Sequence, residues 1–190
     1  MGGNDVALQP LTCTVINMAI LNLLTPQVCL DNACGCALPC DDPLYGFSTG
    51  CLSNFCAIPC GYGYILHLFG TRIKTYVDRL TSKTRPKTIG VCMIYYPDEA
   101  ESKGWADRPL SLLGYNSNPK RLQGIIDKIF KDATSNISLQ NTTVVPIELS
   151  KVLNGKDTRD YVERVEPSEA GGKKMAEYIW QQILSASIYN

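Results

Sequence analysis

The chain has 190 residues, 45% of them hydrophobic, and its 18 Lys and Arg residues balance its 18 Asp and Glu residues. This length and composition are typical of one globular domain, and zero formal charge gives no electrostatic reason to expect a nucleic acid as partner. A single histidine argues against zinc enzymes with several histidine ligands. Nine cysteines exceed what an ordinary cytosolic domain carries, and an odd number cannot pair completely.

The chain begins abruptly, with Gly2-Gly3-Asn4-Asp5 directly after Met1. A secretory signal would need a basic stretch followed by an apolar one, and neither stands here. We therefore expect an N-terminus cut from a longer chain. The apolar stretch from Leu11 to Leu24 predicts a buried first helix that is too short to span a membrane.

Seven cysteines fall between Cys29 and Cys60, in a segment that contains a duplication. Cys29–Cys34 matches Cys51–Cys56, and Ala37–Cys40 matches Ala57–Cys60. The segment has the composition of a loop and no periodic apolar pattern that would let it pack. This favours disulfides as the cross-links that stabilise it. Zinc binding and unpaired thiols stay open as alternatives, although paired Cys-x-x-Cys spacings are absent. We treat residues 29–60 as a cysteine-rich insertion.

Two N-glycosylation sequons, Asn136-Ile137-Ser138 and Asn141-Thr142-Thr143, stand in a polar stretch. Beside the dense cysteine segment, the two sequons favour the secretory pathway. The sequence therefore predicts a protein that is secreted or lies in a secretory lumen.

A helix is predicted from Tyr64 to Leu80, where apolar residues recur at helical spacing. These apolar positions are Ile65, Phe69, Ile73, Val77 and Leu80. His67 falls on the opposite, polar face, which predicts a solvated histidine rather than a catalytic one. The run Thr88–Tyr95 is apolar throughout and predicts a parallel strand covered on both faces, with Cys92 as a free core thiol.

The second half of the chain alternates helix and strand signals. A polar loop containing Trp105 is expected between Pro97 and Pro119, and Pro119 begins a helix with apolar positions on one side. Val144–Leu149 predicts a second strand, and Ser168 can cap a last helix. Alternating elements of this kind predict the α/β fold class.

The pattern Gly46-Phe47-Ser48-Thr49-Gly50 fits the Gly-x-Ser-x-Gly nucleophile elbow. That motif needs a strand before it and a helix after it, whereas Pro43 and no apolar run precede it here. We therefore expect a glycine-rich turn.

Two segments carry a resemblance to a known family. The opening Gly2–Asp5 and the late segment Glu163–Gly172 resemble the GxND and DxxHP blocks of the SGNH (GDSL-type) hydrolases, the second block running into a terminal helix. The resemblance implies an incomplete flavodoxin-like, three-layer parallel sheet over residues 1–190, interrupted by the cysteine-rich insertion. It implies no cofactor and no metal.

In that family a serine attacks an ester carbonyl, a histidine accepts the serine proton, and an aspartate three residues earlier orients the histidine. The resemblance implies that Asn4, with Gly3 in the same block, serves the oxyanion. Glu163 and Glu166 stand where the family has its aspartate and histidine, and no serine block precedes Gly2.

A glutamate can replace the histidine as a base only if burial or a like-charged neighbour raises its pKa. Glu163 and Glu166 could act on each other in this way. The alternative is a structural pair placed favourably ahead of a helix N-terminus.

The sequence thus predicts the C-terminal part of an SGNH-like hydrolase of acyl or acetyl esters. The 190-residue chain by itself is expected to hydrolyse no ester. A missing N-terminal segment or a partner chain would complete it, and neither nucleic acid nor a transmembrane segment is expected. The alternative is a non-catalytic, cysteine-rich structural or interaction subunit built on a decayed hydrolase fold.

Overall fold

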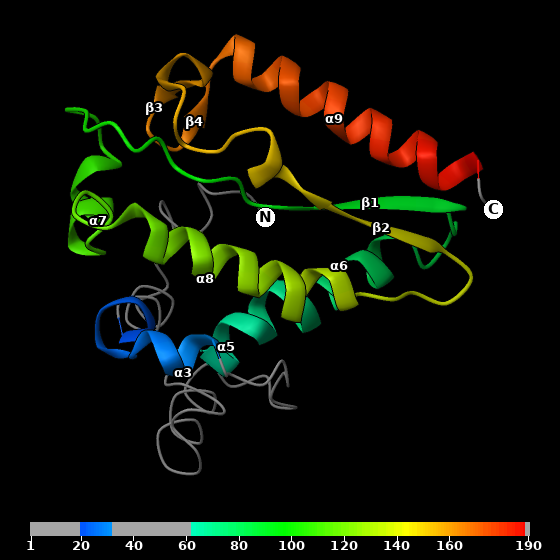
Figure 1. The fold of residues 1–190 in the computed structure, drawn as a ribbon. Helices are drawn as coiled ribbons and strands as arrows, with labels where there is room; N and C mark the ends of the chain where they lie inside the picture. Colours follow the sequence, from blue (N-terminus) through cyan, green and yellow to red (C-terminus); the bar gives the residue numbers. More distant parts are fainter. Residues whose placement is uncertain (1–19, 32–61, 189–190) are drawn as a thin grey trace.

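The computed structural model describes residues 20–31 and 62–188 of the chain (Figure 1). Gly3, Asn4, the Gly46–Gly50 turn and the cysteines between Cys34 and Cys60 lie outside these residues, as does most of the predicted first helix. The predictions about them remain predictions.

The centre of the fold is a parallel pair of strands, β1 (Thr88–Met93) and β2 (Thr143–Glu148). Their register places Thr88 opposite Thr143 and Met93 opposite Glu148. The connection between them carries helix α8 (Pro119–Asp132), because two parallel strands need a crossover rather than a hairpin. Both predicted strands and the helix beginning at Pro119 are confirmed.

Helices cover the two faces of this sheet, with α9 (Glu169–Ile188) on one side and α8 with α6 (Ile73–Leu80) on the other (Figure 1). On the α9 side, Ile147 packs with apolar residues of the helix. A Cβ atom on Gly90 would lie 2.9 Å from Ile147 Cδ1 and 3.2 Å from Ile183 Cδ1, so the glycine lets α9 approach the sheet closely. On the α8 side, Met93 joins the larger core cluster.

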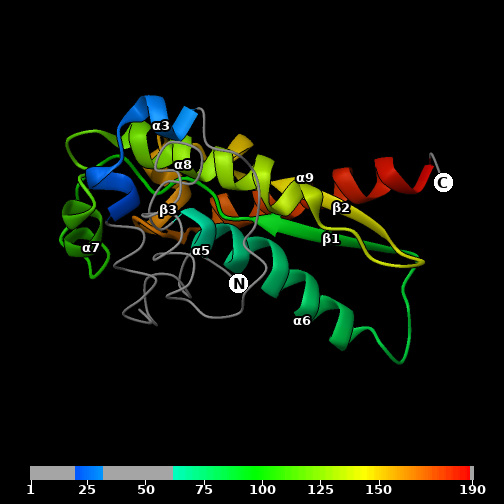
Figure 2. The same ribbon diagram turned by 90° about the horizontal axis from the view of Figure 1, so that it is seen from below.

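The predicted helix around His67 is present, but its regularity is broken. It consists of α5 (Tyr62–Leu66), a π-helical segment (His67–Arg72) and α6, which follow one another along one line (Figure 2). A π turn holds more residues than an α turn, so it rotates the helix face. Leu80, which follows the π-helical segment, is 68% exposed. His67 is buried, with 3% of its surface exposed, because every residue from Ile65 to Phe69 is buried and no face of the helix is left to solvent there. The prediction of a solvated His67 is wrong, as is the inward placement of Leu80.

Two further predictions need correction. The expected loop after Pro97 contains a short helix, α7 (Asp107–Leu112), whose Leu110 is buried. Cys92 is free, as predicted, but it is exposed rather than in the core. It shares the face of β1 that carries Gly90, and α9 lies close to that face at Gly90 and then diverges from the strand (Figure 1).

A short antiparallel hairpin, β3 (Tyr161–Glu163) and β4 (Glu166–Pro167), leads into α9. The Gly171 N–H donates to Ser168 Oγ over 3.2 Å, which confirms Ser168 as the cap of this helix. The remaining elements are a π-helical segment (Ile20–Leu24), α3 (Gln27–Asp31) and three 3-10 turns (Thr134–Asn136, Leu149–Lys151, Thr158–Asp160).

The described residues thus combine helices with a small parallel sheet, in keeping with the predicted α/β class. A flavodoxin-like strand order and a disulfide-rich insertion remain predictions. Within residues 20–31 and 62–188, no helix has both the length and the apolar character needed to cross a membrane.

Candidate functional site

The β3–β4 hairpin lies beside the segment that continues the carboxyl end of β1. The Asp98 N–H donates to the Arg164 carbonyl oxygen over 2.7 Å, and the Tyr95 hydroxyl donates to the Val165 carbonyl oxygen over 2.7 Å. In open α/β sheets, ligands bind outside the carboxyl ends of the strands. The hairpin therefore occupies the part of this fold where a functional site is expected.

The hairpin brings the two predicted site glutamates together, because Glu163 and Glu166 stand opposite each other in its register. Trp105 Nε1–H donates to Glu166 Oε1 over 3.2 Å. The Glu163 carboxylate lies against Gly104, where an added Cβ atom would stand 1.5 Å from Glu163 Oε2. The side chain of Glu163 thus fills the space that the missing side chain of Gly104 leaves.

Glu163 Oε2 is buried and accepts no hydrogen bond from any part of the chain that the structure describes. A buried acceptor without a donor is costly, so this oxygen marks a place where a donor from elsewhere would be stabilising. Asn4 and Gly3 belong by resemblance to the same site, but they lie outside the described residues. Their placement beside Glu163 remains a prediction.

Arg164, between the two glutamates, fixes the hairpin in place. It is 1% exposed, and its guanidinium donates from Nε to the Asp98 carbonyl oxygen over 3.2 Å and from Nη1 to Asp107 Oδ1 over 2.8 Å. Nη1 also donates to Asn116 Oδ1 over 2.7 Å, and the group lies 5.5 Å from the centre of the Tyr115 ring. No local sequence pattern singles out Arg164, because its partners lie far away from it in the chain.

Four tyrosines surround the junction between the hairpin and β1, and burial raises the pKa of each. The pKa of Tyr95 rises to about 12 through burial and, secondarily, through the negative charge of Glu166. Burial likewise raises the pKa of Tyr115 to about 12. The pKa values of Tyr96 and Tyr161 are also raised, mainly by burial.

These raised pKa values predict a two-stage tyrosine titration. In the folded chain, Tyr95 and Tyr115 should ionise near pH 12, whereas in concentrated urea all ten tyrosines should ionise near pH 10. The protonated phenols stabilise the fold, so this contribution is complete below pH 10 and is lost as the pH rises toward 12. Phenolate absorbance at high pH measures the effect. A single transition near pH 10 in the folded chain would contradict the burial of these rings.

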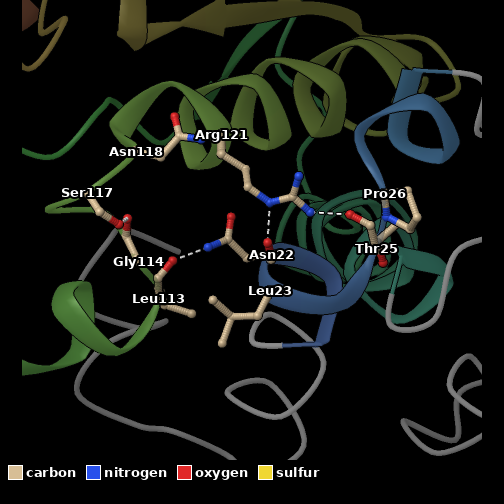
Figure 3. A pocket seen from close by; sticks show the side chains of 9 residues that line it. All are labelled: Asn22, Leu23, Thr25, Pro26, Leu113, Gly114, Ser117, Asn118 and Arg121. Atoms are coloured by element: carbon tan, nitrogen blue, oxygen red, sulfur yellow. Dashed lines mark hydrogen bonds between the residues drawn. The ribbon is translucent and has the colours of Figure 1, made fainter.

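A separate cavity of about 370 Å³ lies between residues 20–26 and the start of α8 (Figure 3). Arg121 crosses it and donates to the carbonyl oxygens of Leu21, Asn22 and Thr25, which end the π-helical segment. Asn22 Nδ2 donates to the Leu113 carbonyl oxygen. The arginine thus satisfies carbonyl groups at a helix end, a structural task. The lining residues are Asn22, Leu23, Thr25, Pro26, Leu113, Gly114, Ser117, Asn118 and Arg121.

No protein-family model matches the chain, and comparisons with curated proteins and with solved structures found no match either. The resemblance to the SGNH hydrolases therefore rests on the sequence blocks. Among the described residues, no group of three or more His, Cys, Asp or Glu side chains is placed to hold a metal ion.

Proposed function

We propose that the chain is an SGNH-type, ester-hydrolase-like domain of the secretory lumen or the extracellular space, with acyl or acetyl esters as its substrate class. The observation that carries the proposal is the hairpin of Glu163 and Glu166 beside the carboxyl end of a parallel strand. The buried Glu163 Oε2, which lacks a donor among the described residues, supports it further.

In this proposal, Asn4 and Gly3 approach the hairpin and serve the oxyanion of an ester intermediate. Ester hydrolysis by this family also needs a serine nucleophile and a base to accept its proton. The blocks present in the 190 residues include no counterpart of the serine block, and Glu166 replaces the histidine. We therefore propose that the 190-residue chain by itself does not hydrolyse esters.

One observation favours the alternative function, a non-catalytic interaction or structural subunit. The Glu166 carboxylate already accepts a hydrogen bond from the Trp105 indole. Such a bond fixes the position of the carboxylate, which suits a structural clamp between the hairpin and the segment before α7.

Ester turnover tests the activity directly. Only background hydrolysis of a short-chain p-nitrophenyl ester is expected from the purified chain, from its Glu166→Gln variant and from a Glu177→Gln control, whose side chain is 62% exposed on α9. The reason is that no serine nucleophile is expected at this site. Turnover by the unaltered chain that disappears only in Glu166→Gln would show that the inactivity proposal is wrong.

The coding sequence upstream of Met1 separates the two functions. A Gly-Asp-Ser block encoded in frame there supports the ester-hydrolase proposal. If the upstream sequence is read and encodes no such block, the hydrolase proposal fails for this gene and the non-catalytic subunit takes its place.

A further inference from the structure

The segment between α8 and β2 carries both N-glycosylation sequons, and the structure places their two asparagines in different surroundings. Asn136 ends the 3-10 turn that follows α8, and Asn141 lies in the turn before β2. Both are exposed. This turn lies at the amino ends of the parallel strands, away from the β3–β4 hairpin (Figure 1).

The side-chain amide of Asn136 already donates hydrogen bonds within the protein. Its Nδ2 donates to the carbonyl oxygens of Lys131 and Asp132, each over 3.0 Å. These carbonyls belong to the last turn of α8, where helix carbonyls lack partners within the helix. Asn136 therefore acts as a C-terminal cap for α8.

Asn141 lies at the tip of a tight turn. The turn is closed by an antiparallel bridge between Leu139 and Thr142. Asn141 adopts a left-handed backbone with φ of 57°, which asparagine tolerates better than most residues. Within the described part of the chain, its amide makes no hydrogen bond, so nothing there competes for Nδ2.

We propose that Asn141, and not Asn136, is the N-glycosylation site of this protein, an inference that rests on the proposed secretory location. The glycosyl donor is an oligosaccharide linked through its first sugar to a lipid diphosphate. The bond between sugar C1 and Asn141 Nδ2 forms as the bond between C1 and the diphosphate oxygen breaks. The diphosphate leaves with the bonding electrons, and one Nδ2 proton is released to a base.

The same modification has different consequences at the two asparagines. A glycosylated amide keeps one N–H, so a glycan on Asn136 would remove at least one of its two capping hydrogen bonds. A glycan on Asn141 removes none. It would also project from the end of the sheet opposite the hairpin, which leaves the Glu163–Glu166 region open.

The test measures glycan occupancy at each asparagine of the full chain. The chain is secreted from eukaryotic cells with a cleavable N-terminal signal peptide as its leader. Mass spectrometry after enzymatic deglycosylation should find Asn141 occupied and Asn136 largely unmodified. Thr143→Ala, which destroys the Asn141 sequon, should abolish the glycosidase-sensitive mobility shift. Thr142→Ala is the matched control, because it changes the neighbouring threonine and keeps the sequon.

Equal or greater occupancy at Asn136, or no glycan at either asparagine in the secreted chain, would overturn the assignment. A second sample distinguishes a failure of the Asn141 assignment from a failure of the proposed secretory location. If the leader-directed chain is modified at Asn141 but the chain isolated from its native source carries no glycan, the assignment of Asn141 as acceptor stands and the proposed secretory location fails.

Discussion

Replacing Arg164 with methionine should lower the free energy of unfolding by about 3 to 5 kcal/mol, the cost expected for breaking a buried ion pair. The substitution removes the donors to Asp107, Asn116 and the Asp98 carbonyl oxygen from a site that is 1% exposed. Asp107 and Asn116 would lose the positive partner that holds them. Urea-induced unfolding followed by tryptophan fluorescence measures the change.

Arg159→Met is the matched control for this experiment. Arg159 also pairs with an aspartate, Asp157, over 2.9 Å, but its side chain is 88% exposed. An exposed pair of this kind contributes little to stability, so the control should unfold close to the unaltered chain. Equal losses in both variants would contradict the assignment of Arg164 as the anchor of the hairpin.

Gly171→Ala should lower the free energy of unfolding by about 3 kcal/mol, the upper end of the cost of overpacking. A Cβ atom at this position would lie 2.2 Å from the Asp160 carbonyl oxygen. That oxygen accepts the Ser168 N–H over 2.8 Å, so a shift to relieve the clash would disturb the entry to α9. The change in the urea midpoint of unfolding reports the effect.

The neighbouring Gly172 provides a control of opposite sign. A Cβ atom on Gly172 meets nothing within 4 Å. Since glycine is a poor helix former, Gly172→Ala should raise the free energy of unfolding by about 0.5 to 1 kcal/mol. If both alanine variants changed stability in the same direction and by the same amount, the close approach of α9 to Asp160 would be wrong.

Local patterns explain which parts of the fold could be predicted from the sequence. In α8 the periodic positions Leu122, Ile125 and Ile129 are buried, and the helix begins at Pro119 as expected. Continuous apolar runs located β1 and β2, and Ser168 supplied the cap of α9. Each of these signals arises within a few residues of the element that it predicts.

The helix around His67 shows where such periodic arguments fail. The prediction assumed 3.6 residues per turn from end to end. A π-helical segment changes that spacing, so the residues before and after it no longer follow one apolar stripe. The sequence alone carries no signal for the π turn, nor for the packing that buries every residue from Ile65 to Phe69, His67 among them.

The candidate site depends on contacts that the sequence does not report. Trp105 and Glu166 are separated by 61 positions, and Arg164 and Asp107 by 57. Resemblance selected Glu163 and Glu166, but only the fold shows that Gly104 makes room for the Glu163 carboxylate. The short α7 was missed for a related reason, since its Leu110 is buried in tertiary packing within a polar segment.

Photo-crosslinking from position 4 measures whether the GxND block meets the Glu163–Glu166 hairpin, as the proposed site requires. The full chain with p-benzoylphenylalanine at Asn4 should crosslink to tryptic peptides 104–120, 160–164 or 165–173. The same group at Lys83, an exposed residue in the turn before β1, should not. Crosslinks from position 4 that map to α6 or to the amino ends of β1 and β2, and never to the hairpin peptides, would show that the GxND block does not meet the hairpin.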